Sequence, residues 1–96
     1  MPNYNRVNMG ATSDINDIIN EGAFSRGQSR SDVIRLAIKQ RYSLNELEPV
    51  KGPYTLFLRV NIPKEGVAYV RELAYDNELT LASIYCAMIK KYLHGS

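Results

Sequence analysis

The sequence contains few residues of the kinds that build disulfides, metal sites or membrane spans. It has one cysteine, Cys86, and one histidine, His94. These two residues can form neither an intrachain disulfide nor a zinc cluster. The longest apolar stretch, residues 81–89, is interrupted by Ser83 and is too short to cross a bilayer. We therefore expect no metal, no cofactor, no membrane contact and a cytoplasmic location, with Cys86 as a buried structural thiol.

Charge is modest as well. Twelve basic residues against ten acidic ones give a net charge of +2, which by itself gives weak support for a nucleic-acid partner. The sequence has no evident nucleophile–base pair, glycine-rich phosphate loop or group of metal ligands, so we expect a protein that is not an enzyme.

The clearest pattern lies in the second half of the chain. Apolar and polar residues alternate over residues 55–62, as in a strand with one buried face. Pro63 suits the first turn of a helix, which the apolar spacing predicts over Glu65–Asn77. Thr80 is a favourable N-cap for a second helix. The predicted order is strand, helix, helix.

The first half has the same order in a fainter form. Residues 6–11 alternate, and Thr12-Ser13-Asp14 is a helix-start signal. Gly27 suits the end of that helix, and either Ser29 or Ser31 would cap the next one, whose inner face could extend to Tyr42.

A shift of 51 residues lays one half on the other without a gap. We call this offset the repeat shift. The positions that it matches are apolar residues and caps: Val7 with Leu58, Met9 with Val60, Ala11 with Ile62, Ile19 with Val70, Ala23 with Ala74, Ser29 with Thr80, Val33 with Ile84 and Ile38 with Ile89. This agreement indicates an internal duplication. We predict one unit over residues 1–44, a second over 55–94, and a proline- and glycine-containing linker over 45–54.

The segment Ser29-Arg30-Ser31-Asp32-Val33-Ile34 resembles the start of the second helix in ribbon-helix-helix (Arc/MetJ-type) proteins, and the second copy from Thr80 is a looser match. The strand that ends at Ile62-Pro63 and the helical segment 70–74 are also similar to that family. The resemblance implies an α+β, mostly α fold in which two ribbon-helix-helix units form an intramolecular pseudo-dimer with a two-stranded antiparallel ribbon and four helices. It also implies binding to double-stranded DNA through the ribbon.

A two-stranded ribbon fits the major groove of DNA. If the apolar strand residues face the core, the other face presents the candidate base contacts: Arg6, Asn8, Gly10, Phe57, Arg59 and Asn61. Arginine can read guanine and asparagine can read adenine, Gly10 would allow close backbone approach, and Phe57 could touch a thymine methyl. The alternative is a solvated ribbon face, with Phe57 folded back onto the protein.

Helix N-termini favour phosphate, so the candidate phosphate contacts are Ser29, Arg30, Ser31 and Thr80. In the alternative interpretation these residues are caps alone. Leu81 stands where Arg30 stands in the first copy, so we expect the two half-faces to differ and the target site to be asymmetric or only loosely repeated.

The remaining basic residues, such as Arg35 and Arg41, are expected to be solvated. Five tyrosines are expected to fill core edges rather than stack on bases: Tyr42, Tyr69, Tyr75, Tyr85 and Tyr92. Some of them could instead mark an interface through which modules self-associate on adjacent DNA sites.

Two functions therefore compete. The first is a sequence-specific DNA-binding protein, either a transcriptional repressor or an accessory factor in plasmid or phage DNA processing such as conjugation. The second is a protein-interaction module, antitoxin-like or an adaptor, whose ribbon does not read DNA.

Overall fold

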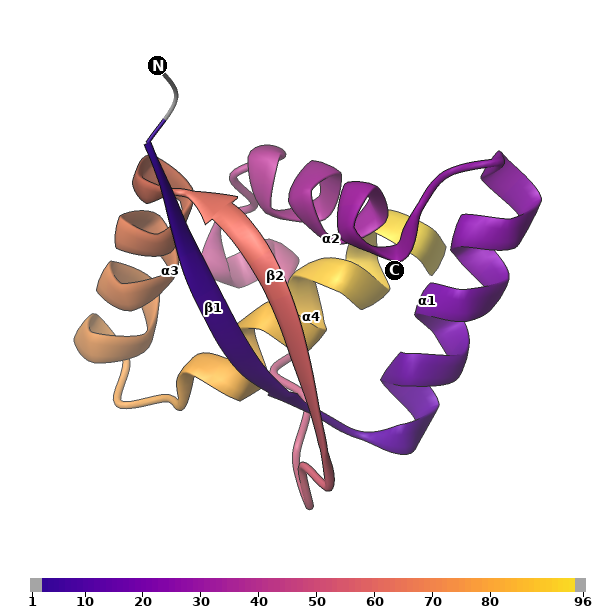
Figure 1. Ribbon diagram of the computed structural model, residues 1–96. Coiled ribbons are helices and arrows are strands. Elements are labelled where there is room, and N and C mark those ends of the chain that lie inside the picture. The colour runs from indigo at the N-terminus through magenta and orange to yellow at the C-terminus, as the bar shows by residue number, and fades with distance from the viewer. Residues whose placement is uncertain (1–2, 95–96) are drawn as a thin grey trace.

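The computed structural model describes residues 3–94, so residues 1 and 2 of the expected first unit lie outside it. Within that range the chain forms β1 (Tyr4–Ala11), α1 (Ser13–Arg26), α2 (Arg30–Lys39), a short 3-10 helix (Leu44–Glu46), β2 (Leu56–Pro63), α3 (Lys64–Asp76) and α4 (Leu81–His94). The fold is α+β and mostly helical. The two strands pair antiparallel into one sheet that crosses in front of α4, with α3 to one side and α1 to the other (Figure 1).

Hydroxyl caps begin three of the helices, as their short side chains predict. The Thr12 hydroxyl accepts from the backbone N–H of Ile15 at 3.2 Å. Ser29, rather than Ser31, caps α2 by accepting from the N–H of Asp32 at 3.1 Å, and Thr80 accepts from the N–H of Ser83 at 3.2 Å. The N-cap position of α3 is Pro63, which supplies no side-chain acceptor.

The repeat shift found in the sequence also relates the observed elements. Applied to the starts of β1, α1 and α2, it gives positions 55, 64 and 81, against observed starts at 56, 64 and 81. The helix ends match in hydrogen bonding. The N–H of Gln28 donates to Ala23 O at 3.0 Å, and at the matching place in the second half the N–H of Leu79 donates to Ala74 O at 2.9 Å.

The turn after the first helix of each half uses a left-handed residue, which satisfies the last helical carbonyls. Gly27 has φ 62°, as its predicted role at the helix end requires. The residue at the same place in the second half is Glu78, with φ 55°. A side chain at this φ is strained, because its Cβ approaches the following carbonyl.

A single core fills the space between the sheet and the helices. The inner strand residues Met9, Ala11, Val60 and Ile62 are buried, as the alternation predicts. The helices contribute, among others, the matched buried residues Ile19 and Val70, Ala23 and Ala74, Val33 and Ile84, and Ile38 and Ile89. Burying one such isoleucine contributes about 1.5–3 kcal/mol, so the matched apolar positions supply a large part of the stabilisation.

Some predicted boundaries were wrong by a few residues. The helix expected from Glu65 begins at Lys64, and Pro63 ends β2 instead of lying in the first helical turn. Tyr42 lies beyond α2, because Arg41 adopts a left-handed backbone with φ 53° that the helix cannot continue through. The Tyr42 ring still packs against the core.

The expected linker over residues 45–54 is more ordered than its prolines and glycine suggested. Its start lies in the 3-10 helix, and the Leu47 side chain is buried in the core. The N–H of Val50 donates to Ser83 O at 3.3 Å, and the Tyr54 hydroxyl donates to Val50 O at 2.5 Å. The segment therefore packs along the molecule instead of merely bridging its halves.

The tyrosines divide between core and surface. Tyr85 is buried, and Tyr42, Tyr69 and Tyr92 lie at core edges as expected. For Tyr75 the expectation was wrong, because its side chain is 87% exposed near the C-terminal end of α3. The matching residue of the first half, Phe24, is 90% exposed near the C-terminal end of α1. Each half thus carries a solvated aromatic residue at the same place.

Candidate nucleic-acid interface

The uncovered face of the sheet carries the six strand residues singled out in the sequence. In the antiparallel register Arg6 lies opposite Asn61, Asn8 opposite Arg59 and Gly10 opposite Phe57. Directly opposed residues on one face of a sheet have Cβ atoms about 4.5–5.5 Å apart. The structure therefore sets each ribbon arginine beside an asparagine from the other strand.

The polar members of this face point to solvent. Arg6, Asn8, Arg59 and Asn61 are all exposed. Among residues 3–94, none of their side chains makes a hydrogen bond or an ion pair. The strands contain two arginines and no carboxylate, so the ribbon is positively charged although the net charge of the chain is small. This face has donors and acceptors available for another molecule.

Phe57 and Gly10 behave differently from the polar residues. The Phe57 side chain is 68% exposed, so it does not fold back onto the protein. Gly10 is half-buried, and a Cβ added there would lie 3.1 Å from Tyr54 Cβ. Tyr54 can approach this closely because Gly10 has no side chain. The backbone of Gly10 is therefore less accessible to another molecule than we expected.

The start of α2 lies on the β2 side of the sheet and that of α4 on the β1 side, because α2 packs against β2 and α4 against β1. At the α2 end Ser29 and Arg30 are exposed and Ser31 is half-buried. The Arg30 guanidinium donates to the side-chain oxygen of Asn16 at 2.5 Å, which holds it in place at the surface. The arrangement leaves further guanidinium N–H groups for an anion.

The start of α4 has Thr80 and Leu81 exposed and offers no cation of its own. A cation missed by sequence reasoning lies beside it. Arg71 of α3 lines a hollow of about 390 Å³ together with Arg6, Asn8 and Leu81. The positive charge that Arg30 provides in the first half is therefore provided in the second half by a different helix, and only the packing of α3 beside α4 reveals it.

Matched contacts tie the sheet to the second helix of each half. Arg35, expected to be solvated, donates through Nη1 to Asn61 O at 3.3 Å. At the matching position in the second half, the Cys86 thiol donates to Gly10 O at 3.6 Å. Both acceptors are backbone carbonyls of strand residues whose side chains point outward. These contacts therefore hold the two strands against α2 and α4.

The two groups have different electrostatic environments. The Arg35 guanidinium, 2.6 Å from Asp32 Oδ1, is the main cause that lowers the pKa of that exposed carboxyl, and Ser29 adds to the effect. Burial raises the pKa of the Cys86 thiol to about 11. Cys86 is therefore the buried structural thiol that its apolar surroundings in the sequence predict.

Three further findings bear on the class of protein. Residues 3–94 contain no group of three or more histidine, cysteine, aspartate or glutamate side chains placed to hold a metal ion. No helix within that range is long and apolar enough to cross a membrane. No protein-family model, curated protein sequence or solved structure matches the chain.

Proposed function

We propose that this protein binds double-stranded DNA sequence-specifically by inserting its ribbon into the major groove. The observation that carries the proposal is the solvent-exposed face on which two Arg–Asn pairs lie side by side, without side-chain partners among residues 3–94. Arginine hydrogen-bonds guanine and asparagine hydrogen-bonds adenine through the edges that bases present in the major groove. A ribbon of two strands is narrow enough to enter it.

The fold in this proposal is that of a ribbon-helix-helix pseudo-dimer made within one chain. Its support is the repeated strand-helix-helix order, in which the repeat shift brings the element starts into agreement. Asn8 and Arg59 are matched by the repeat shift and also lie directly opposite each other in the sheet. A twofold pseudo-symmetry axis would therefore pass between these two residues.

Phosphate contacts would fix the ribbon in the groove, since contacts to the DNA backbone position a protein whereas contacts to base edges specify the sequence. On the β2 side, Arg30 and the free N–H groups in the first turn of α2 would bind a phosphate of one DNA strand. The start of α4 with Arg71 would hold the other on the β1 side. Ser29 and Thr80 would contribute mainly as caps, because their hydroxyl oxygens already accept backbone N–H groups.

The target is then an asymmetric site. Under the pseudo-symmetry, Arg6 corresponds to Phe57 and Gly10 to Asn61. The two half-sites would face different side chains, whereas a homodimer presents the same ones twice. A selection from random duplexes should return a site without an inverted repeat, and recovery of a perfect inverted repeat within one footprint would contradict this.

The biological role we propose is that of a repressor or of an accessory factor in plasmid or phage DNA processing. Such a role fits a cytoplasmic location and a reduced thiol at Cys86. Self-association on adjacent sites is part of the proposal, because Phe24 and Tyr75 present solvated aromatic rings at matched places in the two halves. The same exposed aromatics, together with Phe57, favour the alternative of a protein-interaction module.

Two measurements separate these functions. The first titrates the protein onto random duplex DNA at two salt concentrations, where a DNA-binding protein loses affinity steeply as salt rises. No binding at low salt would leave the interaction module as the better proposal. The second compares Arg59→Ala with Lys51→Ala, an exposed cation of the segment between the halves. Arg59→Ala should cost roughly 1–3 kcal/mol on the selected site and relax its sequence preference, whereas Lys51→Ala should change neither.

A further inference from the structure

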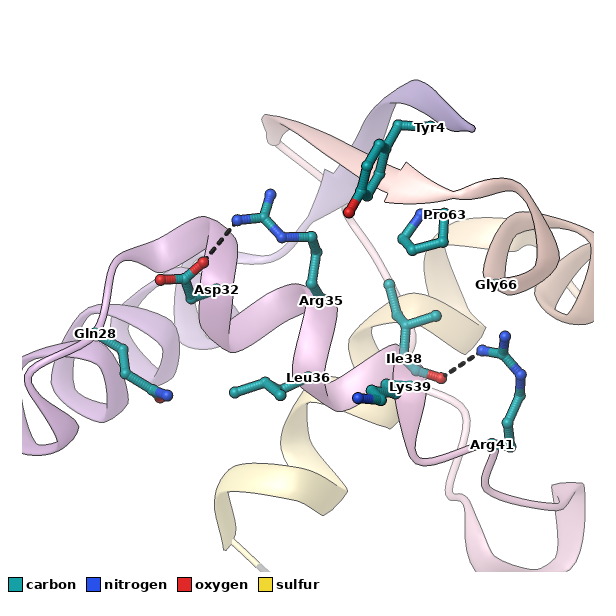
Figure 2. A pocket seen from close by; sticks show the side chains of 10 residues that line it. All are labelled: Tyr4, Gln28, Asp32, Arg35, Leu36, Ile38, Lys39, Arg41, Pro63 and Gly66. Atoms are coloured by element: carbon teal, nitrogen blue, oxygen red, sulfur yellow. Dashed lines mark hydrogen bonds and ion pairs between the residues drawn. The ribbon is translucent and has the colours of Figure 1, made fainter. Parts of the chain in front are cut away.

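A cavity of about 510 Å³ lies beside the ribbon end where β1 begins and β2 stops (Figure 2). Its walls come from α2, from the first turn of α3 and from the ribbon itself. A volume of this size is within the range of about 300–1,000 Å³ in which small-molecule sites fall. The proposed contact with DNA does not use this cavity.

The charge of the lining is predominantly positive. Arg35, Lys39 and Arg41 contribute three cations against one carboxylate, that of Asp32. Arg35 rises from α2 beside the Tyr4 hydroxyl, while Arg41 lies beyond Ile38 (Figure 2). The Arg35 Nη2 group is bound to Asp32, so the positive charge left over belongs to the two other cations and to the remaining Arg35 donors. A bound molecule would therefore be an anion.

Arg41 is held in its place before any ligand arrives. Its Nη1 donates to Ile38 O at 3.0 Å, and its guanidinium lies 5.5 Å from the centre of the Tyr69 ring. The Tyr69 hydroxyl in turn donates to Tyr42 O at 2.6 Å. Arg41 therefore contributes a positive charge at a fixed place at one end of the cavity.

Gly66 lets the first turn of α3 pack closely against α2 and β2 at one wall of the cavity. A Cβ at this residue would lie 3.0 Å from Ile38 Cγ2 and 3.4 Å from Arg41 Nη1. Apolar side chains also line the cavity, among them Leu36, Ile38 and Pro63. Such walls match an aromatic or aliphatic body better than they match a bare inorganic ion.

One polar atom of the lining lacks a partner. The Gln28 side-chain oxygen is buried and accepts no hydrogen bond from the described residues. A buried acceptor without a partner costs about 1–3 kcal/mol, so a ligand that donates a hydrogen bond there would remove that cost.

We propose that this cavity binds a small organic anion with an apolar body and a hydrogen-bond donor. The anionic group meets the free donors of Arg35, the body covers Leu36, and the donor faces Gln28. Arg35 also donates to Asn61 O, so the ligand would touch the side chain that supports the ribbon. Binding of the ligand does not depend on the proposed role of the ribbon.

The test uses anilinonaphthalene sulfonate, a fluorescent probe that has an anionic group, an aromatic body and an N–H donor. It is titrated into the full chain without DNA, so the outcome is independent of whether DNA binds. We expect one saturable site, from which inorganic phosphate displaces the probe. Arg35→Gln should weaken binding roughly tenfold or more, since it removes a charge-assisted hydrogen bond. The matched control is Arg26→Gln, in an exposed arginine of α1 outside the cavity, and it should leave binding unchanged.

A second measurement avoids substitutions. Amide NMR shifts of the unmodified protein, followed during the same titration, should change first at Gln28, Leu36 and Gly66. Equal affinity in Arg35→Gln and Arg26→Gln would overturn the proposal, as would unsaturable binding. Shift changes centred on the exposed Phe24 and Tyr75 rings, rather than on the cavity, would overturn it too.

Discussion

The two guanidinium groups that flank the ribbon allow a quantitative test of the proposed DNA binding. Arg30 lies at the start of α2 on the β2 side, and Arg71 lines the hollow at the start of α4 on the β1 side. If each contacts one phosphate, each releases counterions on binding. Arg30→Gln and Arg71→Gln remove these contacts one at a time and leave the exposed backbone of both helices unchanged.

The size of the effect follows from counterion release. Each lost phosphate contact lowers the slope of log affinity against log salt by about 0.9 in magnitude. Between about 50 and 200 mM salt, one contact is therefore worth a change of about 3.5-fold in affinity, and the double variant should lose about 1.8 from the slope. The two effects should add, because the residues lie on opposite sides of the ribbon and share no partner among the described residues.

The assay is fluorescence anisotropy on the selected duplex at several salt concentrations, with Arg26→Gln as the control. Arg26 lies at the C-terminal end of α1 and stacks over Tyr92 at 5.3 Å, so its loss should leave the slope unchanged. If Arg71→Gln keeps the parent slope while Arg30→Gln lowers it, the idea that Arg71 replaces the missing cation of α4 is refuted. If neither lowers it, both phosphate assignments fail.

Three further predictions concern the fold and its surface. Glu78→Gly should stabilise the protein by about 0.5–1 kcal/mol, because it removes the strain of a side chain in a left-handed conformation. Gly27→Ala introduces that strain and should destabilise the protein by about 1 kcal/mol. Urea unfolding measures both changes, and a less stable Glu78→Gly with a more stable Gly27→Ala would contradict the assignment of these residues as left-handed helix caps. The Cys86 thiol, buried and with a pKa of about 11, should resist alkylation at pH 8 until the protein unfolds, and stability should fall between about pH 9 and 11, because the unfolded thiol ionises first. Phe24→Ser and Tyr75→Ser should each reduce cooperative binding to duplexes with two adjacent sites without changing binding to one site, as band-shift titrations would reveal.

Much of the fold could be predicted because its signals are local. The alternation of apolar and polar residues located both strands to within two residues at each end. The helix caps at Thr12, Ser29 and Thr80 use hydroxyl side chains that can be recognised in the sequence. Because the repeat shift aligns the two halves, the clear pattern of the second half also indicated where the elements of the first half lie. The outward face of the ribbon follows from the same alternation, so its five exposed residues, all except Gly10, can be identified from the sequence alone.

The features that were missed depend on contacts between distant segments. Arg71 is one basic residue among twelve, and only the packing of α3 against α4 brings it to the ribbon edge. Gly10 is covered by Tyr54, which lies in the segment between the two halves, far away along the chain. Tyr75 directly follows the buried Ala74, and side chains so close in sequence point in different directions on a helix.

Both strands of the ribbon belong to one covalent chain, and this has a consequence for how the protein behaves at low concentration. A ribbon assembled from two molecules comes apart when the protein is diluted below its dimerisation constant. Here strand pairing is a unimolecular step, so the surface with the Arg–Asn pairs persists at any dilution at which the chain stays folded. A few copies would therefore present a complete ribbon, and the occupancy of a single isolated site would depend on the first power of the protein concentration.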